Sequence, residues 1–424
     1  MNANTTPPRL DRDPSFRRFW AAHAAAQLGE QISLLALPLA AAVTLAATPL
    51  EMGWLSAAQS APYLLIALFA GVWVDRNRRR PIMVASDLSR AAVLAAIPLA
   101  ASFDLLSIAG LTVIGFAVAI AAVLFDVAAQ SYLPTIARRD QLGPANARLE
   151  LTRSVALVAG PGAAGLLMQV LAPAQAIVAT AIAYLVSAVL LGAIRAPEPR
   201  PAAGVETSMG RAIADGIAFV AAHRVLRALT LTALVWNLSW FVLMAAFVLV
   251  ATRLLGFTPA MLGLAFAAQG AGMLIGAALA QPIAARTGLG RSLVIGPAIS
   301  ALACPLFALA PPGPWGAACF AGGLFLFGLG PTIWAVNQMT LRQAVTPNAL
   351  LGRVNATIRF ASWGARPLGA LLGGWIGESV GLHAALWLAA AGFALQILPV
   401  LLSPIPRLGV GADLDQAAKA PLRA

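Results

Sequence analysis

Long apolar runs separated by short polar breaks fill almost the whole chain. Twelve of these runs come close to or exceed the roughly 20 residues that a helix needs to cross a bilayer. Backbone groups in lipid must satisfy their own hydrogen bonds, and the sequence lacks the alternating ten-residue strands of a membrane barrel, so the runs predict helices. The predicted helices cover residues 18–46, 52–74, 82–103, 105–132, 151–172, 175–194, 228–252, 259–284, 292–310, 315–340, 355–377 and 382–403.

The composition makes a bilayer the natural solvent of this chain. Of its 424 residues, 60% are hydrophobic and only 10% are charged, whereas soluble domains carry about 25% charged residues. The net charge of +12 does not indicate nucleic acid, because the arginines lie in short breaks between apolar runs. They gather before the first run and after every second one, with Arg253 as the exception. Basic residues mark the cytoplasmic side, so we expect a multi-pass protein of the cell (inner) membrane with both termini in the cytoplasm.

The longest interior break divides the chain into two halves. Residues 196–227 begin with a proline-rich stretch, which predicts a flexible linker. Apolar residues at helical spacing then predict an interfacial amphipathic helix; they are Ile213, Ile217 and Val220. We therefore expect a six-helix bundle over residues 1–195 and a second bundle with a cytoplasmic tail over residues 228–424.

The two halves resemble each other. The segment GWLSAAQ, from Gly53 to Gln59, recurs as GLAFAAQ from Gly263 to Gln269, an offset of 210 residues. Such repeats around a central site are how many secondary transporters are built. The pattern predicts a duplicated architecture with its binding site between the halves.

The segment GVWVDRNRRR, residues 71–80, carries the strongest local signal. It resembles the cytoplasmic signature of the major facilitator superfamily, with Gly71, Asp75, Arg76 and Arg79 at matching positions and Arg78 in place of the usual second glycine. A plain basic stop after the second run explains the arginines but not the position of the acid. The resemblance implies an all-α membrane protein of the major facilitator fold, with 12 transmembrane helices in two six-helix bundles around a central cavity.

The same resemblance implies a conformational latch at this segment. In the family, the acidic residue, here Asp75, links one half to the other. The second half has alanine, Ala285, at the equivalent acidic position, so the latch is expected to be asymmetric. Asp87 and Arg90, three residues apart in the third run, are expected to pair with each other or with this segment.

Wider features resemble one exporter branch of the family. The FRRFW start, the Gly29-Glu30 pair and the segment LFDVAAQSYLPTIARRDQLGPANARL are similar to macrolide-efflux and siderophore-exporter proteins, called transmembrane secretion effectors. Gly160, Pro161 and Gly165 resemble the glycine-proline motif of antiporters, with a plain packing face as the alternative. Gly369 and Gly373 form a comparable small-residue stripe in the eleventh run, which favours close helix packing.

Two acids within apolar runs are candidates for proton coupling, because charge inside a membrane is costly and marks function. Glu30 lies near the middle of the first run. The face that it shares with His23 and Gln27, with Gln31 adjacent, predicts a water-filled cavity. Asp126, which shares a face with Gln130, is the second candidate. Structural hydrogen bonding is the alternative for both acids, and the fourth run has no arginine, unlike many proton-coupled relatives.

Three groups of polar and aromatic residues are candidates for the substrate cavity, which helices 1, 4, 7 and 10 line in the family. An apolar pocket with aromatic walls and a few amides suits an amphiphile. Arg366, in the eleventh run, could pair with a carboxylate of the other half, attract an anionic solute group or extend to the surface. The other candidates are Trp236, Asn237 and Trp240 in the seventh run and Trp334, Asn337 and Gln338 in the tenth.

The sequence favours a transporter over an enzyme. It contains no nucleotide-binding glycine loop, zinc-ligand cluster or nucleophile elbow, and its three histidines are far apart. We expect a monomer that exports a small amphiphilic drug-, macrolide- or siderophore-like compound by proton antiport, with no cofactor and no metal. The expected partners are that solute, protons and the lipid bilayer. An importer of the same fold, a lipid-conjugate flippase and a non-transporting sensor remain alternatives.

Overall fold

The computed structural model describes residues 13–138, 141–198, 209–347 and 350–409, and all regular elements in these ranges are helices. The first half contains α1 (Pro14–Leu39), η2 (Ala40–Thr44), α2 (Pro49–Leu65), α3 (Ala67–Arg76), α4 (Arg79–Ser102), α5 (Ile108–Ile136), α6 (Leu142–Val170) and α7 (Pro173–Gly192). A separate helix, α8 (Met209–Ala222), follows the linker. The second half contains α9 (Arg224–Leu249), η4 (Val250–Leu254), α10 (Pro259–Thr287), α11 (Leu289–Ala303), α12 (Pro305–Ala308), α13 (Pro314–Val345), α14 (Leu351–Ser379), α15 (Leu382–Leu395), α16 (Leu398–Leu401) and η5 (Ile405–Arg407).

Polar caps determine where several of these helices begin. Asp13 caps α1 by accepting a hydrogen bond from the backbone N–H of Ser15 at 2.7 Å. Thr48 and Glu51 form a reciprocal capping box at the start of α2, and Thr258 caps α10. Such caps satisfy the free N–H groups of the first turn. The two threonines stand at repeat-related positions, so both halves begin their second long helix in the same way.

The chain is a multi-pass membrane protein. Ten helices within the described residues are long and apolar enough to cross a membrane. The predicted all-α fold is therefore confirmed, whereas the count of twelve spans stays a prediction. The two other predicted spans are also helical, but α2 and α3 are separated at Ile66, and α14 carries several charges, including Arg353, Arg359 and Arg366.

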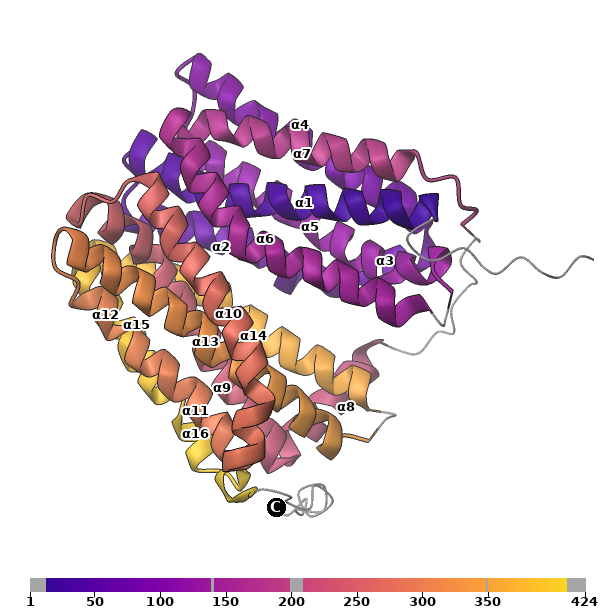
Figure 1. Ribbon diagram of the computed structural model, residues 1–424, viewed down its shortest axis with the longest axis vertical. Coiled ribbons are helices and arrows are strands. Elements are labelled where there is room, and N and C mark those ends of the chain that lie inside the picture. Colours follow the sequence, from indigo (N-terminus) through magenta and orange to yellow (C-terminus); the bar gives the residue numbers. More distant parts are fainter. Residues whose placement is uncertain (1–12, 139–140, 199–208, 348–349, 410–424) are drawn as a thin grey trace, which may run out of the picture.

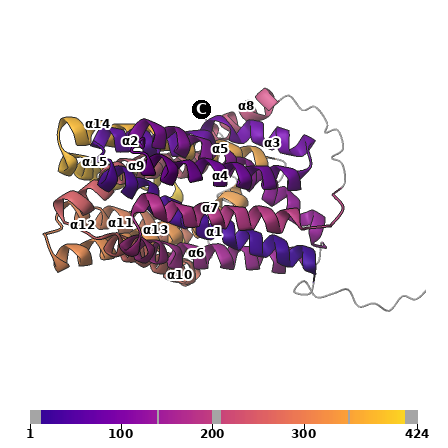
Figure 2. The same cartoon turned by 90° about the horizontal axis from the view of Figure 1, so that it is seen from above.

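The helices form two bundles that meet at one end and diverge toward the other (Figure 1). We call the end with the α3–α4 turn and α8 the linker end. The far end is the one with the loops 45–48 and 255–258. Two helix pairs join the bundles: α2 packs against α14, and α6 packs against α10. Figure 2 shows these pairs on opposite faces of the molecule.

The first helix of each half ends in the same irregular way. α1 continues into the π-helical turn η2, and α9 continues into the π-helical turn η4, 210 residues later. Both turns precede the capping threonines of the next helix. The repeat seen in the sequence thus recurs as a local backbone feature at the far end.

Two glycine–glycine contacts bring the bundles together. A Cβ atom on Gly53 would lie 3.0 Å from the Cα of Gly374, and a Cβ atom on Gly165 would lie 3.0 Å from the Cα of Gly263. Both positions are too close for any side chain, so only glycine fits there. The repeat relates the two contacts. The offset of 210 residues maps Gly53 onto Gly263, and an offset of 209 residues, which also relates Leu142-Gly143 to Leu351-Gly352, maps Gly165 onto Gly374.

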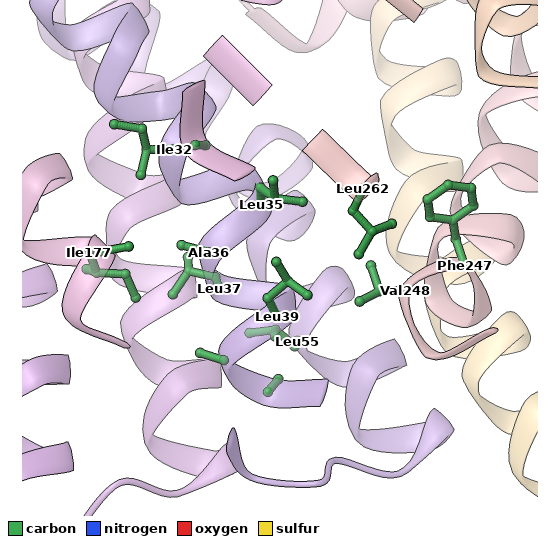
Figure 3. Packing of buried hydrophobic residues seen from close by; sticks show 14 of the residues in the cluster. Ile32, Leu35, Ala36, Leu37, Leu39, Leu55, Ile177, Phe247, Val248 and Leu262 are labelled. Atoms are coloured by element: carbon green, nitrogen blue, oxygen red, sulfur yellow. The ribbon is translucent and has the colours of Figure 1, made fainter. Parts of the chain in front are cut away.

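Apolar side chains seal the region around these contacts. Figure 3 shows Leu39 and Leu55 of the first bundle on one side, with Val248 and Leu262 of the second bundle on the other. All four belong to one buried cluster that extends through both halves. The far end is therefore held by continuous packing across the bundle boundary.

Candidate functional site: a cavity between the two bundles

A cavity of about 420 Å³ lies between the bundles. This volume is within the range of small-molecule sites. Its polar lining comes from both halves: Glu30 and Gln31 of α1, Gln59 and Tyr63 of α2, Gln269 of α10 and Arg366 of α14. Its apolar lining includes Leu34, Trp240, Phe241, Met244, Phe266 and Met273. The composition suits an amphiphilic solute.

Glu30 and Arg366 are the charged residues of this lining, one from each bundle. The Gln27 amide donates a hydrogen bond to Glu30 Oε2 at 3.5 Å. Next to Glu30, Gln31 packs against Gly160, where a Cβ atom would lie 2.5 Å from the Gln31 Cβ. Gly160 thus lets α6 approach α1 beside the acid and helps to fix that part of the cavity wall.

Arg366 is held in place by the second bundle. Its Nε donates a hydrogen bond to Asn237 Oδ1 at 2.9 Å, and the Asn237 amide donates in turn to the Ala233 carbonyl at 2.8 Å. The guanidinium lies 5.0 Å from the Trp363 ring centroid and 5.7 Å from that of Phe241. Arg366 therefore stays at the cavity wall and does not extend to the surface.

Of the two tryptophans of α9, one lines the cavity and the other does not. Trp236 and Trp240 stack with their ring centroids 5.5 Å apart. Trp240 lines the cavity, whereas Trp236 lies behind it and contacts Phe393 of α15. Asn237 acts through Arg366, as described above, and is not part of the lining itself.

The prediction that Trp334, Asn337 and Gln338 of the tenth run line the cavity is corrected, because none of them borders it. Asn337 is fully buried and donates a hydrogen bond to the Ala280 carbonyl of α10. Trp334 packs against Gly296 of α11. This face of α13 therefore turns toward α10 and α11, and Gln338 is likewise absent from the lining.

The second predicted acid lies outside the lining but close to it. Asp126 of α5 lies beside the Tyr63 hydroxyl and within electrostatic range of Glu30. Gln130, one turn later, is exposed. His23 does not line the cavity either: it lies in the field of the Glu150–Arg153 ion pair of α6. Of the polar stripe predicted on α1, only Glu30 and Gln31 reach the cavity.

Asp87 and Arg90 are paired in the interior of the first bundle and are fully buried. The Arg90 guanidinium lies between the rings of Phe125 and Tyr184, at 4.6 and 4.1 Å from their centroids. Of the two expected arrangements, the structure has the one in which Asp87 and Arg90 pair with each other; Arg90 is about 16 Å along the helix axis from the start of α4. The fourth run contains no arginine, and the charge of Arg90, from the third run, acts on both Glu30 and Asp126.

The 71–80 segment is tied to its own bundle. Glu198, after α7, accepts hydrogen bonds from the backbone N–H groups of Arg79 and Arg80 and thereby caps α4. The Arg80 guanidinium also donates to the Ile194 carbonyl. The Asp75 side chain, the acid of the predicted latch, lies outside the described part of the chain, while Gly71 has open space around it and Arg76 is exposed. No local pattern indicates the role of Glu198, because the helix that it caps is more than 100 residues away along the chain.

The small-residue motifs lie at helix crossings. Gly165 meets Gly263 between the bundles, as described above, and Pro161 lines the cavity. In α14, Gly369 packs against the backbone of Leu238 and Gly373 against that of Val242, both in α9. These contacts fix α14, and with it Arg366, against the wall of the second bundle.

Polar bonds cross between the bundles at the far end. Arg253 of η4 donates a hydrogen bond to the Ala47 carbonyl at 2.5 Å, just after η2. In the opposite direction, the Leu50 N–H at the start of α2 donates to Glu378 of α14 at 3.4 Å. Arg253, the exception to the arginine pattern, therefore joins the two halves.

Two helical bundles around a solute-sized cavity, in a chain of many apolar spans, define a membrane transporter. The chain belongs to the Major Facilitator Superfamily, whose family profile matches residues 19–362. The resemblance noted in the sequence is therefore confirmed.

Relatives with assigned names are efflux pumps. The multidrug efflux pump Tap of Mycolicibacterium fortuitum is 28% identical over 380 residues, which cover 87% of this chain and 90% of the relative. The protein of the same name from Mycobacterium tuberculosis is 29% identical over 431 residues, 97% of each chain.

Solved structures of transporters share the fold. A bacterial homologue of the iron transporter ferroportin, in an inward-facing state, matches with a TM-score of 0.76, 14% identity and coverage of 93% of this chain and 99% of that one. The nucleoside transporter NupG matches with a TM-score of 0.74, 11% identity and coverage of 91% and 98%.

Proposed function

We propose that this transporter exports a small amphiphilic compound by proton antiport and alternating access. The observation that carries the proposal is Glu30, a carboxylate in the wall of an apolar and aromatic cavity between the two bundles. The efflux-pump relatives, which align over almost the whole chain, support export. The cavity must open first to one side of the membrane and then to the other to exchange proton and solute, so the two bundles must rock about it.

The proposed orientation puts the linker end in the cytoplasm. The arginine pattern supports this, because basic residues favour the cytoplasmic side. With the bundles joined at the far end and divergent at the linker end (Figure 1), the structure then corresponds to an inward-facing state. The moving units are residues 1–195 and 228–424, connected by residues 196–227, in a monomer of the inner membrane with both termini in the cytoplasm.

In the proposed cycle, Glu30 binds a proton from outside and releases it to the cytoplasm. Protonation removes a charge from the cavity wall and favours solute release in the outward-facing state; loss of the proton favours solute binding in the inward-facing state. Asp126 beside Tyr63 is a second position at which the proton can reside. Each charge that crosses 100 mV supplies about 2.3 kcal/mol, to which a pH gradient adds. No cofactor or metal enters this cycle.

Replacing Glu30 tests the proposal. In sealed inverted vesicles with an imposed pH gradient, Glu30→Gln should abolish proton-driven solute accumulation, because the neutral amide cannot exchange a proton. Solute binding without a gradient should weaken, because the amide is neutral like the protonated acid, but it should remain measurable at higher solute concentration, which separates loss of coupling from loss of folding. Asp104→Asn is the matched control, since Asp104 is an exposed carboxylate in a far-end loop, outside the cavity. Accumulation by Glu30→Gln at the rate of the unmodified protein would rule Glu30 out as the coupling group.

A further inference from the structure

The cavity lining contains one anionic and one cationic side chain, each from a different bundle. Glu30 comes from the first bundle and Arg366 from the second. They do not pair with each other: the charges that act on Glu30 are those of Arg90 and Arg153, and no carboxylate lies within salt-bridge distance of Arg366 among the described residues. The cavity therefore contains the Glu30 carboxyl group and the Arg366 guanidinium as two separate charged groups.

The arginines near Glu30 already have partners. Arg90 is paired with Asp87, and Arg153 is paired with Glu150 at 2.6 Å. Within the part of the chain that the structure describes, Glu30 itself accepts only the long hydrogen bond from the Gln27 amide. An ionised Glu30 thus lacks a close cation, and a carboxylate in a poorly hydrated site favours one.

Arg366 has the complementary deficit. Its Nε is occupied by Asn237, while no hydrogen bond engages its two terminal nitrogen atoms within the described chain. These atoms form a planar fork that matches the two oxygens of a carboxylate or a similar oxyanion. The rings of Trp363 and Phe241 hold the fork in position, so the site is prepared for an anionic group.

We propose that the solute is a zwitterionic amphiphile, with its cationic group toward Glu30, its oxyanion toward Arg366 and its apolar body against Trp240, Phe241 and Met244. The inference rests on the proposed function, in which this cavity is the transport site. It also gives proton exchange a direct consequence: a proton on Glu30 removes the partner of the cationic group and weakens binding. A purely anionic solute would bind better to the protonated acid, which opposes antiport.

Binding of three matched probes tests the proposal. The zwitterion is 6-(aminomethyl)-2-naphthoate, the anion is 6-methyl-2-naphthoate and the cation is (6-methyl-2-naphthyl)methylammonium. Affinities are measured by calorimetry on the full-length chain in nanodiscs at neutral pH without a gradient. The zwitterion should bind about tenfold or more tightly than either singly charged probe, because each charged hydrogen-bonded contact contributes roughly that factor. Equal affinities of the three probes for the unmodified chain would overturn the proposal.

Variants then assign each charge to its wall. Arg366→Gln should bind the zwitterion no better than the cation, and Glu30→Gln should bind it no better than the anion. Arg366→Lys should retain part of the preference, because it keeps the charge but loses the planar fork. Arg359→Gln is the control: Arg359 lies 5.4 Å from the same Trp363 ring but outside the lining. An equal loss for all three probes in both variants would also overturn the proposal.

These results are independent of the coupling test. If the zwitterion preference appears and Glu30→Gln still pumps, the solute class stands and proton coupling through Glu30 falls. If coupling requires Glu30 but the three probes bind alike, the transport proposal stands and the solute class falls.

Discussion

Single glycines determine how closely the two bundles can approach. At Gly165, a Cβ atom would lie 2.6 Å from the Pro259 carbonyl oxygen, which belongs to the backbone and cannot move aside cheaply. At Gly322 of α13, by contrast, no atom lies within 4 Å of such a Cβ. A change of glycine to alanine should therefore disturb the packing at Gly165 and leave it unchanged at Gly322.

We expect Gly165→Ala to open the far end. The added methyl group should cost about 1–3 kcal/mol in the closed arrangement, and separation of the bundles relieves it. Spin labels at Leu105 and Leu309, exposed residues in far-end loops of opposite bundles, report the separation by electron paramagnetic resonance. Gly322→Ala should leave the distance distribution unchanged. An unchanged distribution for Gly165→Ala would mean that this crossing does not limit closure.

His223 makes the junction between α8 and α9 sensitive to pH. The side chain is buried, and both ring nitrogens lack a hydrogen-bond partner among the described residues. Burial lowers the pKa of His223, and its place at the N-terminus of α9 is one that disfavours a positive charge. His223 is therefore neutral in the docked state, in which α8 packs against α9 and α14.

We expect the docking of α8 to weaken as the pH falls below about 6.5, the ordinary histidine pKa. A lowered pKa in the docked state means that the undocked state binds the proton more readily, so the stabilisation is complete above that value and is lost below it. Hydrogen exchange over residues 209–222, corrected for the intrinsic rate at pH 7.5 and 5.5, measures this. His223→Gln should remove the difference, and a difference that survives in this variant would assign it to another group.

At the scale of elements, helix termini connect the two halves. The Arg253 guanidinium binds the carbonyl that follows η2, and Glu378 accepts from the first turn of α2. Each charge faces the helix end that favours it, a cation at a C-terminus and an anion at an N-terminus. Both bonds must break when the far end opens, so they stabilise the arrangement seen here.

Arg253→Gln and Glu378→Gln should each shift the population toward states that are open at the far end. Single exposed charge contacts contribute about 0.3–1 kcal/mol, so the two changes together should shift the equilibrium roughly three- to thirtyfold. The same label pair, Leu105 and Leu309, reports the change. Arg286→Gln, at an exposed position of the linker end, should have no effect. A closed far end in the double variant would show that packing alone holds it.

The position of helices could be predicted from the sequence, whereas their rotation could not. Apolar runs must span the bilayer whatever their neighbours are, which is why the predicted helices correspond to observed ones. The arginines between the runs likewise lie mainly at the linker end, as their pattern predicts. A helix that is apolar on all sides gives no signal for the face that turns inward. Trp334 and Asn337 were for that reason expected in the cavity, although α13 directs them toward α11 and α10.

Contacts between distant segments were the other feature beyond the reach of the sequence. Glu30 could be predicted as a cavity residue because its charge inside an apolar run is costly. Nothing local indicates that Arg90 lies between Phe125 and Tyr184, or that Glu198 caps α4. Such pairings depend on which helices become neighbours, and only the fold determines that.

At the scale of the whole molecule, two bundles are joined at the far end, and one acid, Glu30, lies in the wall of the cavity between them. The glycine crossings and polar bonds define the closed end, and the lining from both halves defines the site. Rocking of the bundles would expose the same acid to the other side of the membrane. The proposed function links proton and solute movement through Glu30.

The most direct test of this claim is proton movement driven by the solute alone. Proteoliposomes with a pH dye in the lumen are loaded with a transported solute, diluted without any imposed pH gradient, and followed as the solute leaves. The account predicts that the lumen acidifies with the unmodified protein, because protons enter as solute exits, and that Glu30→Gln gives no pH change. A constant lumenal pH during solute efflux by the unmodified protein, or equal acidification by the variant, would contradict it.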